Sequence, residues 1–315
     1  MPDPVIQQIR RGLTEFRGAY YQDRGWSEQV DGRKVAVFSV QGWTDDLFPA
    51  VESFRMFKYL KRLDPLWPVE VALADVGHSR AQNKPETWHR LNDQAFGWLQ
   101  SHIGRSHEQR TTVSSEPTLC SDGAPPERLT ATTPEGLTNG RLSISFPGGT
   151  TVNDAGLADP NGPATDAISG PIVQPGTCRH SAGSPALGGH TVYSAPLTNT
   201  RTYVGIGTVR VPYTLLGASE AAILSARLFD VAPDDTELLI TRGAYRLDTA
   251  GAGELELPLY GNHWRLRPGH RIRLELTQVD SPTYRLSNAP STISFPSATL
   301  TLPTREAGDT VVAPE

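Results

Sequence analysis

The order of apolar and polar positions predicts an α/β arrangement for the first hundred residues. Residues 35–40 form a continuous apolar run rich in β-branched side chains, typical of a strand buried on both faces in a parallel sheet, and the apolar segment 69–74 predicts a second strand. Apolar positions three or four residues apart predict helices over 4–21, over 49–63 and from Pro85 onward. Because strands and helices alternate, we expect the two strands to lie parallel in one sheet with their carboxyl ends at the same edge.

The pattern changes near residue 110, where the helical period ends. Short alternating segments separated by turn residues follow, which is typical of an antiparallel β-sandwich. These segments are residues 141–146, 203–211, 222–229, 238–242 and 271–276. Residues 148–190 are rich in Gly, Pro and Asp, which predicts long loops. We therefore expect two domains, over 1–108 and 109–308, and a short tail over 309–315.

Composition narrows the range of partners. The formal net charge is −5 and Lys and Arg form no cluster, so the chain lacks the basic surface that binds nucleic acid. The longest apolar runs are as long as strands and fall short of the roughly 20 residues of a membrane helix. We expect neither nucleic acid nor a membrane as a partner. The first residues show no export pattern, so a secretion signal is expected only upstream of them.

Two ionisable residues follow the two predicted strands. Asp45 lies in the turn after the first strand, and His78 lies in the loop after the second. Ligands of open α/β sheets bind beyond the carboxyl ends of the strands, so these side chains are expected to meet there. An aspartate in this position can instead cap the next helix, and a loop histidine can simply be exposed. Asp46 is the alternative acid, because Asp45 is distinguished only by its position four residues before Pro49.

These segments resemble a known group of enzymes. Gly-x-x-Asp-x-x-x-Pro at 42–49, followed by Gly-His at 77–78, is similar to the acid and histidine segment of α/β-hydrolases. Residues 228–235, 241–246 and 269–276 resemble the C-terminal domain of X-Pro dipeptidyl-peptidase and cocaine-esterase-like (CocE/NonD) serine hydrolases. The resemblance implies the C-terminal part of an α/β-hydrolase parallel sheet, followed by a jelly-roll (galactose-binding-like) β-sandwich.

The resemblance also implies acyl transfer from an ester or peptide substrate to a serine. His78 would be the general base, and Asp45 would hold its tautomer and stabilise its charged form. The family's nucleophile lies on a Gly-x-Ser-x-Gly elbow well before the acid. Ser27 has neither the preceding strand nor the following helix of an elbow, and Ser184 comes after the histidine. We therefore expect a C-terminal hydrolase fragment whose N-terminal half, with the nucleophile, is missing, and which is inactive alone.

Two further features concern the surroundings of this site. Trp43, beside the acid, is expected either to line an acyl pocket or to pack beneath the strand. Cys120 and Cys178 lie in loop-like segments, where either a disulfide or two free thiols would fit. A disulfide would indicate an oxidising compartment and so favour secretion. Two strands without neighbours would leave open edges and a large apolar patch exposed, so we expect the first hundred residues to be loosely held or aggregation-prone and the sandwich to fold independently.

The sequence predicts no metal and no cofactor. None of the histidines and cysteines has the spacing of a metal site. Acidic residues in the long loops lack the pattern of an EF-hand; they are Asp154, Asp159 and Asp166. The alternative hypothesis makes the sandwich the functional part, as a non-catalytic module that binds a glycan or a cell-surface ligand.

Overall fold

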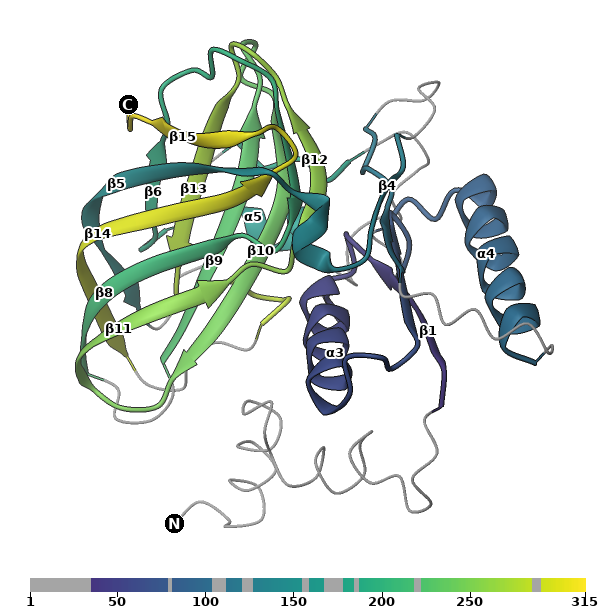
Figure 1. Cartoon of the computed structure of the whole chain (residues 1–315). Helices are drawn as coiled ribbons and strands as arrows, with labels where there is room; N and C mark the ends of the chain where they lie inside the picture. Colours follow the sequence, from purple (N-terminus) through teal and green to yellow (C-terminus); the bar gives the residue numbers. More distant parts are fainter. Residues whose placement is uncertain are drawn as a thin grey trace.

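The computed structural model describes residues 35–315 apart from 79–80, 104–111, 121–126, 155–158, 167–177, 184–186, 218–221 and 285–289. The helix expected over 4–21 lies outside the described residues, as do Ser27 and Ser184. In the described part, a small α/β unit is joined to a larger unit made of two β-sheets, as Figure 1 shows. The larger unit contains eleven of the fifteen strands in the described residues, and this part of the protein is mostly β-sheet.

The α/β unit is built on a sheet that has four strands in the described residues. β1 (Val37–Gly42) and β2 (Val69–Ala74) are parallel neighbours, as the alternation of strands and helices predicts. α3 (Ala50–Leu63) follows β1, and α4 (Pro85–Ile103) follows β2. Since β1 and β2 run in the same direction, the turn after Gly42 and the loop after Ala74 leave the sheet at the same edge.

Each face of this sheet is covered by one of the two helices. Alternate residues of β2, starting at Val69, pack with the buried side of α3, which includes Phe54 and Leu60. The intervening residues Ala72 and Ala74 pack with Leu91 of α4 on the other face. Burial on both faces explains why five of the six residues of β2, all except Glu70, are apolar, instead of apolar and polar residues alternating.

The first sheet extends beyond residue 108, where the sequence places the end of the first domain. β3 (Thr112–Ser115) pairs parallel with β2, and β4 (Leu129–Ala131) pairs antiparallel with β3. β3 has one Val among Thr and Ser, and β4 is only three residues long, so neither carries an apolar run that would identify it as a strand of a buried sheet. In the described residues the first sheet therefore continues to the end of β4, at Ala131.

The remaining strands form two packed sheets. One has the order β10-β9-β13-β6, and the other has the order β11-β8-β14-β5-β15, with β7 and β12 attached beside β14. The strands are β5 (Gly140–Asn153), β6 (His190–Tyr193), β7 (Arg201–Gly205), β8 (Thr208–Leu216), β9 (Ala222–Val231), β10 (Glu237–Leu247), β11 (Gly251–Pro258), β12 (Asn262–Leu266), β13 (Arg271–Thr277), β14 (Ser291–Thr304) and β15 (Gly308–Val312). Apolar side chains from both sheets form one continuous core. Two short helices complete the described elements, η1 (Pro134–Leu137) and α5 (Asn161–Thr165).

Three details of this unit differ from the sequence-based expectation. The segment 203–211 forms two strands, because Gly205 has a φ of +108° and turns the chain between β7 and β8. Residues 148–153, expected in a loop, continue β5. The expected tail over 309–315 contains most of β15, which pairs parallel with β5. Such pairings depend on a distant partner strand rather than on local turn residues.

The two units share a buried polar contact. Trp43 Nε1 donates to Ser115 Oγ over 3.1 Å, and Ser115 Oγ lies 2.9 Å from Nδ1 of His263 in β12. Val204 of β7 lies in the same apolar cluster as α3. The sandwich therefore supports the α/β unit, which the expectation of a loosely held first unit did not take into account. Among the described helices, none is long and apolar enough to cross a bilayer.

This contact predicts a loss of stability in acid. Burial lowers the pKa of His263 from 6.5 to about 4. As the pH falls below 6.5, the unfolded chain takes up a proton that the folded chain does not accept until about pH 4, so stability is full above pH 6.5 and declines below it. The contribution lost by pH 4.5 is about 2–3 kcal/mol.

Urea unfolding of the wild type and of His263→Gln at pH 7 and pH 4.5 measures this effect. Glutamine can still accept a hydrogen bond from Ser115 but does not titrate. The wild type should therefore lose about 2–3 kcal/mol more than the variant over this interval. Equal losses in the two proteins would contradict the role given to His263.

Candidate functional site

The turn after β1 holds the acid in place. Gly42 is required there, because a Cβ atom at this position would lie 1.7 Å from the carbonyl oxygen of Val76 in the next loop. Asp45 follows, with its side chain buried. Its Oδ1 accepts hydrogen bonds from the backbone N–H groups of Leu47 and Phe48, each over 3.1 Å. Asp45 thus stabilises the turn that leads into α3, while its second oxygen, Oδ2, remains available.

The loop after β2 brings the histidine to this acid. Gly77 has a φ of +134°, and a Cβ atom here would lie 2.5 Å from Asp45 Oδ2, so no other residue allows the same approach. Asn83 holds the loop in shape: its Oδ1 accepts from Gly77 N over 2.9 Å, and its Nδ2 donates to His78 O over 3.2 Å. A side chain five residues later therefore fixes the backbone on both sides of His78.

Asp45 and His78 form a hydrogen-bonded pair. His78 Nδ1 lies 2.8 Å from Asp45 Oδ2 and 3.0 Å from Oδ1. An ionised carboxylate can only accept, so Nδ1 carries a proton, and in the neutral imidazole Nε2 then keeps its lone pair. The Asp45 side chain is 6% exposed and that of His78 is 45% exposed. Phe48 stacks on the imidazole with ring centroids 5.4 Å apart, which keeps one face of the ring away from water.

Asp46, the alternative acid, is turned toward the sandwich instead. Its carboxylate is bonded to the guanidinium group of Arg179, and Arg242 Nε of β10 lies 2.9 Å from its Oδ2. All three side chains are nearly inaccessible to water. Of the two neighbouring aspartates, Asp45 is therefore the one that is bonded to His78, whereas Asp46 links the two units.

Trp43 has a packing role in this structure. The indole is 2% exposed and meets the ring of Phe54 edge to face, with centroids 6.0 Å apart. Its N–H is used by Ser115. A side chain with so little accessible surface offers nothing to a substrate, so the geometry favours the packing alternative over an acyl pocket.

Cys120 and Cys178 are joined by a disulfide, with their Cα atoms 5.1 Å apart. Among the described residues, no group of three or more His, Cys, Asp or Glu side chains is arranged to hold a metal ion. Of the loop acids, Asp159 is paired with the buried Arg227, and Asp166 Oδ1 accepts from the hydroxyl of Thr283 over 2.7 Å.

Asp75 is a site residue that the sequence analysis did not single out. It follows the last residue of β2, and its Oδ1 accepts from Thr44 Oγ1 over 2.5 Å and from Gln82 N over 3.1 Å. Burial raises the pKa of Asp75, although both hydrogen bonds and the nearby Arg179 act in the opposite direction. The sequence could have indicated Asp75 as a candidate site residue, because it directly follows a predicted buried strand. The same criterion selected the turn that contains Asp45.

Comparisons with known proteins show which fold the chain has. No protein-family model matches the chain, and no curated protein matches its sequence. An aminopeptidase from a marine sediment archaeon, Thaumarchaeota archaeon, matches the structure with a TM-score of 0.63 and 13% identity, over 95% of this chain and 60% of that one. A CocE/NonD family hydrolase from Staphylococcus aureus matches with a TM-score of 0.59 and 9% identity, over 96% and 59%. The chain shares the fold of CocE/NonD hydrolases.

An α-amino acid ester hydrolase also matches this hydrolase fold, with a TM-score of 0.57 and 13% identity, over 86% of this chain and 56% of that one. The chain thus spans about three fifths of the length of the solved hydrolases that it matches. At these identities the likeness concerns the fold, and the chemistry of this chain has to be argued from its own residues.

The close approach at Gly77 makes a prediction about stability. Gly77→Ala forces a side chain into a left-handed backbone region, at a cost of about 1–3 kcal/mol, and pushes the new methyl group against the Asp45 carboxylate. Gly251→Ala is the matched control, because Gly251 has a φ of +114° and no atom within 4 Å of an added Cβ. Urea unfolding should show Gly77→Ala less stable than Gly251→Ala by about 1 kcal/mol or more. Equal losses would mean that Gly77 does not lie against Asp45.

Proposed function

We propose that this chain supplies the acid and the general base of a serine hydrolase that acts on an ester or amide. The observation that carries the proposal is the hydrogen bond between Asp45 and His78, formed where two parallel strands end at the same edge of the sheet. The fold shared with CocE/NonD hydrolases supports it. The sandwich is proposed to be the jelly-roll, galactose-binding-like domain of such an enzyme.

The arrangement suits acyl transfer. Nε2 of His78 would remove the proton of a serine hydroxyl while the serine oxygen attacks the substrate carbonyl carbon. The imidazolium that results keeps its Nδ1–H bonded to the Asp45 carboxylate, which stabilises the positive charge and holds the ring in orientation. His78 would then pass the proton to the departing alcohol or amine, and water would release the acyl group by the same steps in reverse order.

The nucleophile is proposed to come from a segment outside the described residues. No serine hydroxyl among the residues that the structure describes is hydrogen-bonded to His78. The acid and histidine therefore form two parts of a three-part site, and we propose that the N-terminal half of a longer hydrolase provides the serine.

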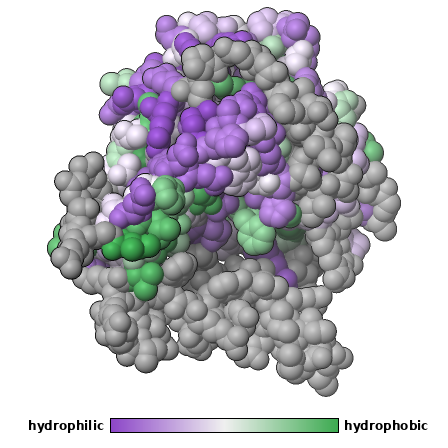
Figure 2. Space-filling view, turned by 90° about the vertical axis from the view of Figure 1, so that its right-hand side faces the viewer, coloured by the Kyte–Doolittle hydropathy of each residue, from purple (hydrophilic) through white to green (hydrophobic). Residues whose placement is uncertain are grey.

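Two surfaces of the α/β unit fit such a partner half. In the described sheet, β1 is an edge strand, so its outer backbone groups have no partner strand there. α4 exposes an apolar stripe on one side, with the spacing of one helix face; it consists of Trp88 (36% exposed), Phe96 (60%), Leu99 (51%) and Ile103 (76%). Figure 2 views the molecule from the side on which α4 lies in Figure 1, and apolar surface is visible there among polar surface. Further strands beside β1, with helices against α4, would bury both features.

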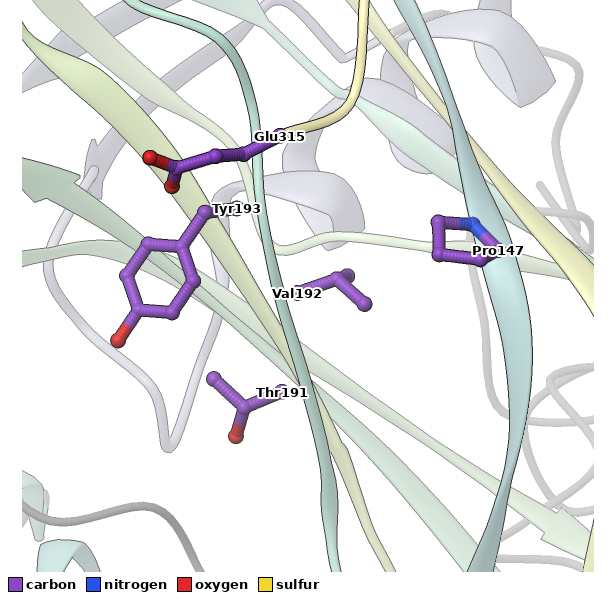
Figure 3. A pocket seen from close by; sticks show the side chains of 5 residues that line it. All are labelled: Pro147, Thr191, Val192, Tyr193 and Glu315. Atoms are coloured by element: carbon purple, nitrogen blue, oxygen red, sulfur yellow. The ribbon is translucent and has the colours of Figure 1, made fainter.

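The alternative of an independent binding module has less support. The hollow on the sandwich in Figure 3, of about 270 Å³, is lined by Tyr193, Glu315 and three other residues. The guanidinium group of Arg271 lies 5.2 Å from the centre of the Tyr193 ring and also pairs with Glu315. The aromatic face and the carboxylate that would recognise a sugar are thus already in use. The buried pairing of Asp46 with Arg242 also ties the sandwich to the α/β unit.

Covalent labelling tests the proposed function. The chain alone, treated with a fluorophosphonate probe and an ester substrate, should show neither labelling nor turnover, because we propose that the activated serine belongs to the upstream half. The chain preceded by the polypeptide encoded directly upstream should be labelled at one upstream serine and should hydrolyse the ester. Labelling of a serine in the chain alone would refute the missing nucleophile, and inactivity of the longer polypeptide would refute the hydrolase function.

Substitutions in that longer polypeptide test the residues. Asp45→Asn should lower kcat by about 10⁴-fold, because an amide can neither hold the tautomer nor balance the imidazolium charge. His78→Ala should lower kcat at least as far, while His89→Ala, an exposed histidine on α4, should leave it unchanged.

The neighbouring aspartates should differ in stability as well. Asp46→Asn removes a buried carboxylate from Arg179 and Arg242, so it should cost about 3–5 kcal/mol of unfolding free energy, measured in urea on the chain as it stands. Asp45→Asn should cost clearly less, since its partner His78 is half exposed. The reverse order would contradict the division of roles between the two residues.

A further inference from the structure

Two segments contact the Cys120–Cys178 disulfide or the residues next to it. They are the turn between β1 and α3, which contains Asp45 and is called the acid turn below, and the loop between β2 and α4, which contains His78 and is called the histidine loop. Arg179 directly follows Cys178 and is bonded to Asp46, the neighbour of Asp45. On the other side, Gln82 Nε2 donates to the carbonyl of Leu119, the residue before Cys120, over 2.6 Å, and lies 3.8 Å from Cys178 Sγ. The disulfide thus closes a connection between the two segments.

Arg179 is the charged group in this connection. It is 4% exposed, and its Nη1 and Nη2 both donate to the Asp46 carboxylate, Nη2 over 3.4 Å to Oδ1. Nη1 also donates to the carbonyl of Thr165 over 3.2 Å. A guanidinium group held by several acceptors in a buried site has a fixed position, because its planar fork allows few alternative arrangements.

The same charge acts on a second carboxylate. Asp75 is buried, and the positive charge of Arg179 is close enough to oppose the rise that burial causes in its pKa. Asp75 itself joins the two segments, because its Oδ1 accepts from Thr44 in the acid turn and from Gln82 in the histidine loop. Arg179 therefore acts on two buried carboxylates, Asp46 beside Asp45 and Asp75 three residues before His78.

We infer that Arg179, anchored by the Cys120–Cys178 disulfide, is a positioning residue for the Asp45–His78 pair. Arg179 bonds to neither member of the pair. It holds the acid turn through its hydrogen bonds to Asp46, while the disulfide next to it contacts the histidine loop through Gln82. The inference rests on the proposed function, because only that function gives the Asp45–His78 pair a catalytic role. The positioning of the pair by Arg179 can nevertheless be tested without measuring turnover.

Loss of Arg179 has a definite physical consequence. Asp46 would lose one of its two buried guanidinium partners, and Asp75 would lose the nearby charge that favours its ionised form. The two segments would relax apart, and the contact between Nδ1 and the Asp45 carboxylate would lengthen. In the active longer polypeptide, a displacement of about 1 Å would lower kcat on the order of 10²-fold with little change in KM.

Proton NMR of the full chain measures the pair directly. A proton held between an imidazole nitrogen and a carboxylate gives a low-field signal, which is assigned to His78 by its disappearance in His78→Gln. In Arg179→Gln the exchange of this proton with water should be at least about tenfold faster. Arg273→Gln is the matched control, because Arg273 is 1% exposed and pairs with Glu237 and Glu275, both within the sandwich. The control should lose stability but keep the signal and its exchange rate.

A second variant keeps the test decisive if Arg179→Gln does not fold. Cys120→Ser combined with Cys178→Ser removes the anchor while all buried charges keep their partners, and it should also speed the exchange about tenfold. An unchanged exchange rate in either folded variant would overturn the inference and leave the proposed function standing. If the imidazole ¹⁵N shifts of His78 in the wild-type chain, read through its carbon-bound ring protons, do not show the proton on Nδ1, the Asp45–His78 pair itself is absent, and the proposed function fails together with the inference.

Discussion

The carboxylate of Asp46, enclosed by the guanidinium groups of Arg179 and Arg242, is the interaction on which the rest of the structure depends. A buried carboxylate is costly unless its charge is matched, so the turn after β1 cannot take this conformation without the sandwich beside it. Burial acts to lower the pKa of Arg242, but Asp280 and Asp46 outweigh burial and raise it, so the guanidinium group stays charged. The two units are therefore joined by matched charges as well as by apolar contact.

The pairing of charges continues into the sandwich. Arg242 Nη1 lies 3.3 Å from Asp280 Oδ1, and the same oxygen is 3.1 Å from Nη1 of Arg227 in β9. Arg227 also pairs with Asp159 and Glu275. Because each carboxylate in this series lies between arginines or beside one, the turn that holds the acid is connected to the interior of the sandwich. This explains how a domain that contributes no residue to the Asp45–His78 pair can set its geometry.

Close approach of backbone segments is the second constraint on the site. Gly42 and Gly77 let the acid turn and the histidine loop touch, and a side chain at either position would collide with the neighbouring segment. The result is a half-exposed imidazole whose Nδ1 is bonded to a buried carboxylate. Under the proposed function, this pair is the acid and base of a site whose serine lies outside the described residues, and the chain spans about three fifths of the hydrolases that share its fold.

Local pattern determined much of this in advance. The apolar runs of β1 and β2, the helical spacing after each and the order of Asp45 and His78 are all properties of neighbouring residues, so the sequence alone predicted parallel strands and two ionisable side chains at one edge. Tertiary structure decided what depends on distant partners. Trp43 became a core residue because Ser115 takes its N–H, and Asp46 became a link because Arg242, far along the chain, lies against it. The short strands of residues 112–131 and the position of Arg179 carry no local period or motif, and only the packing of the two units reveals their place in the site.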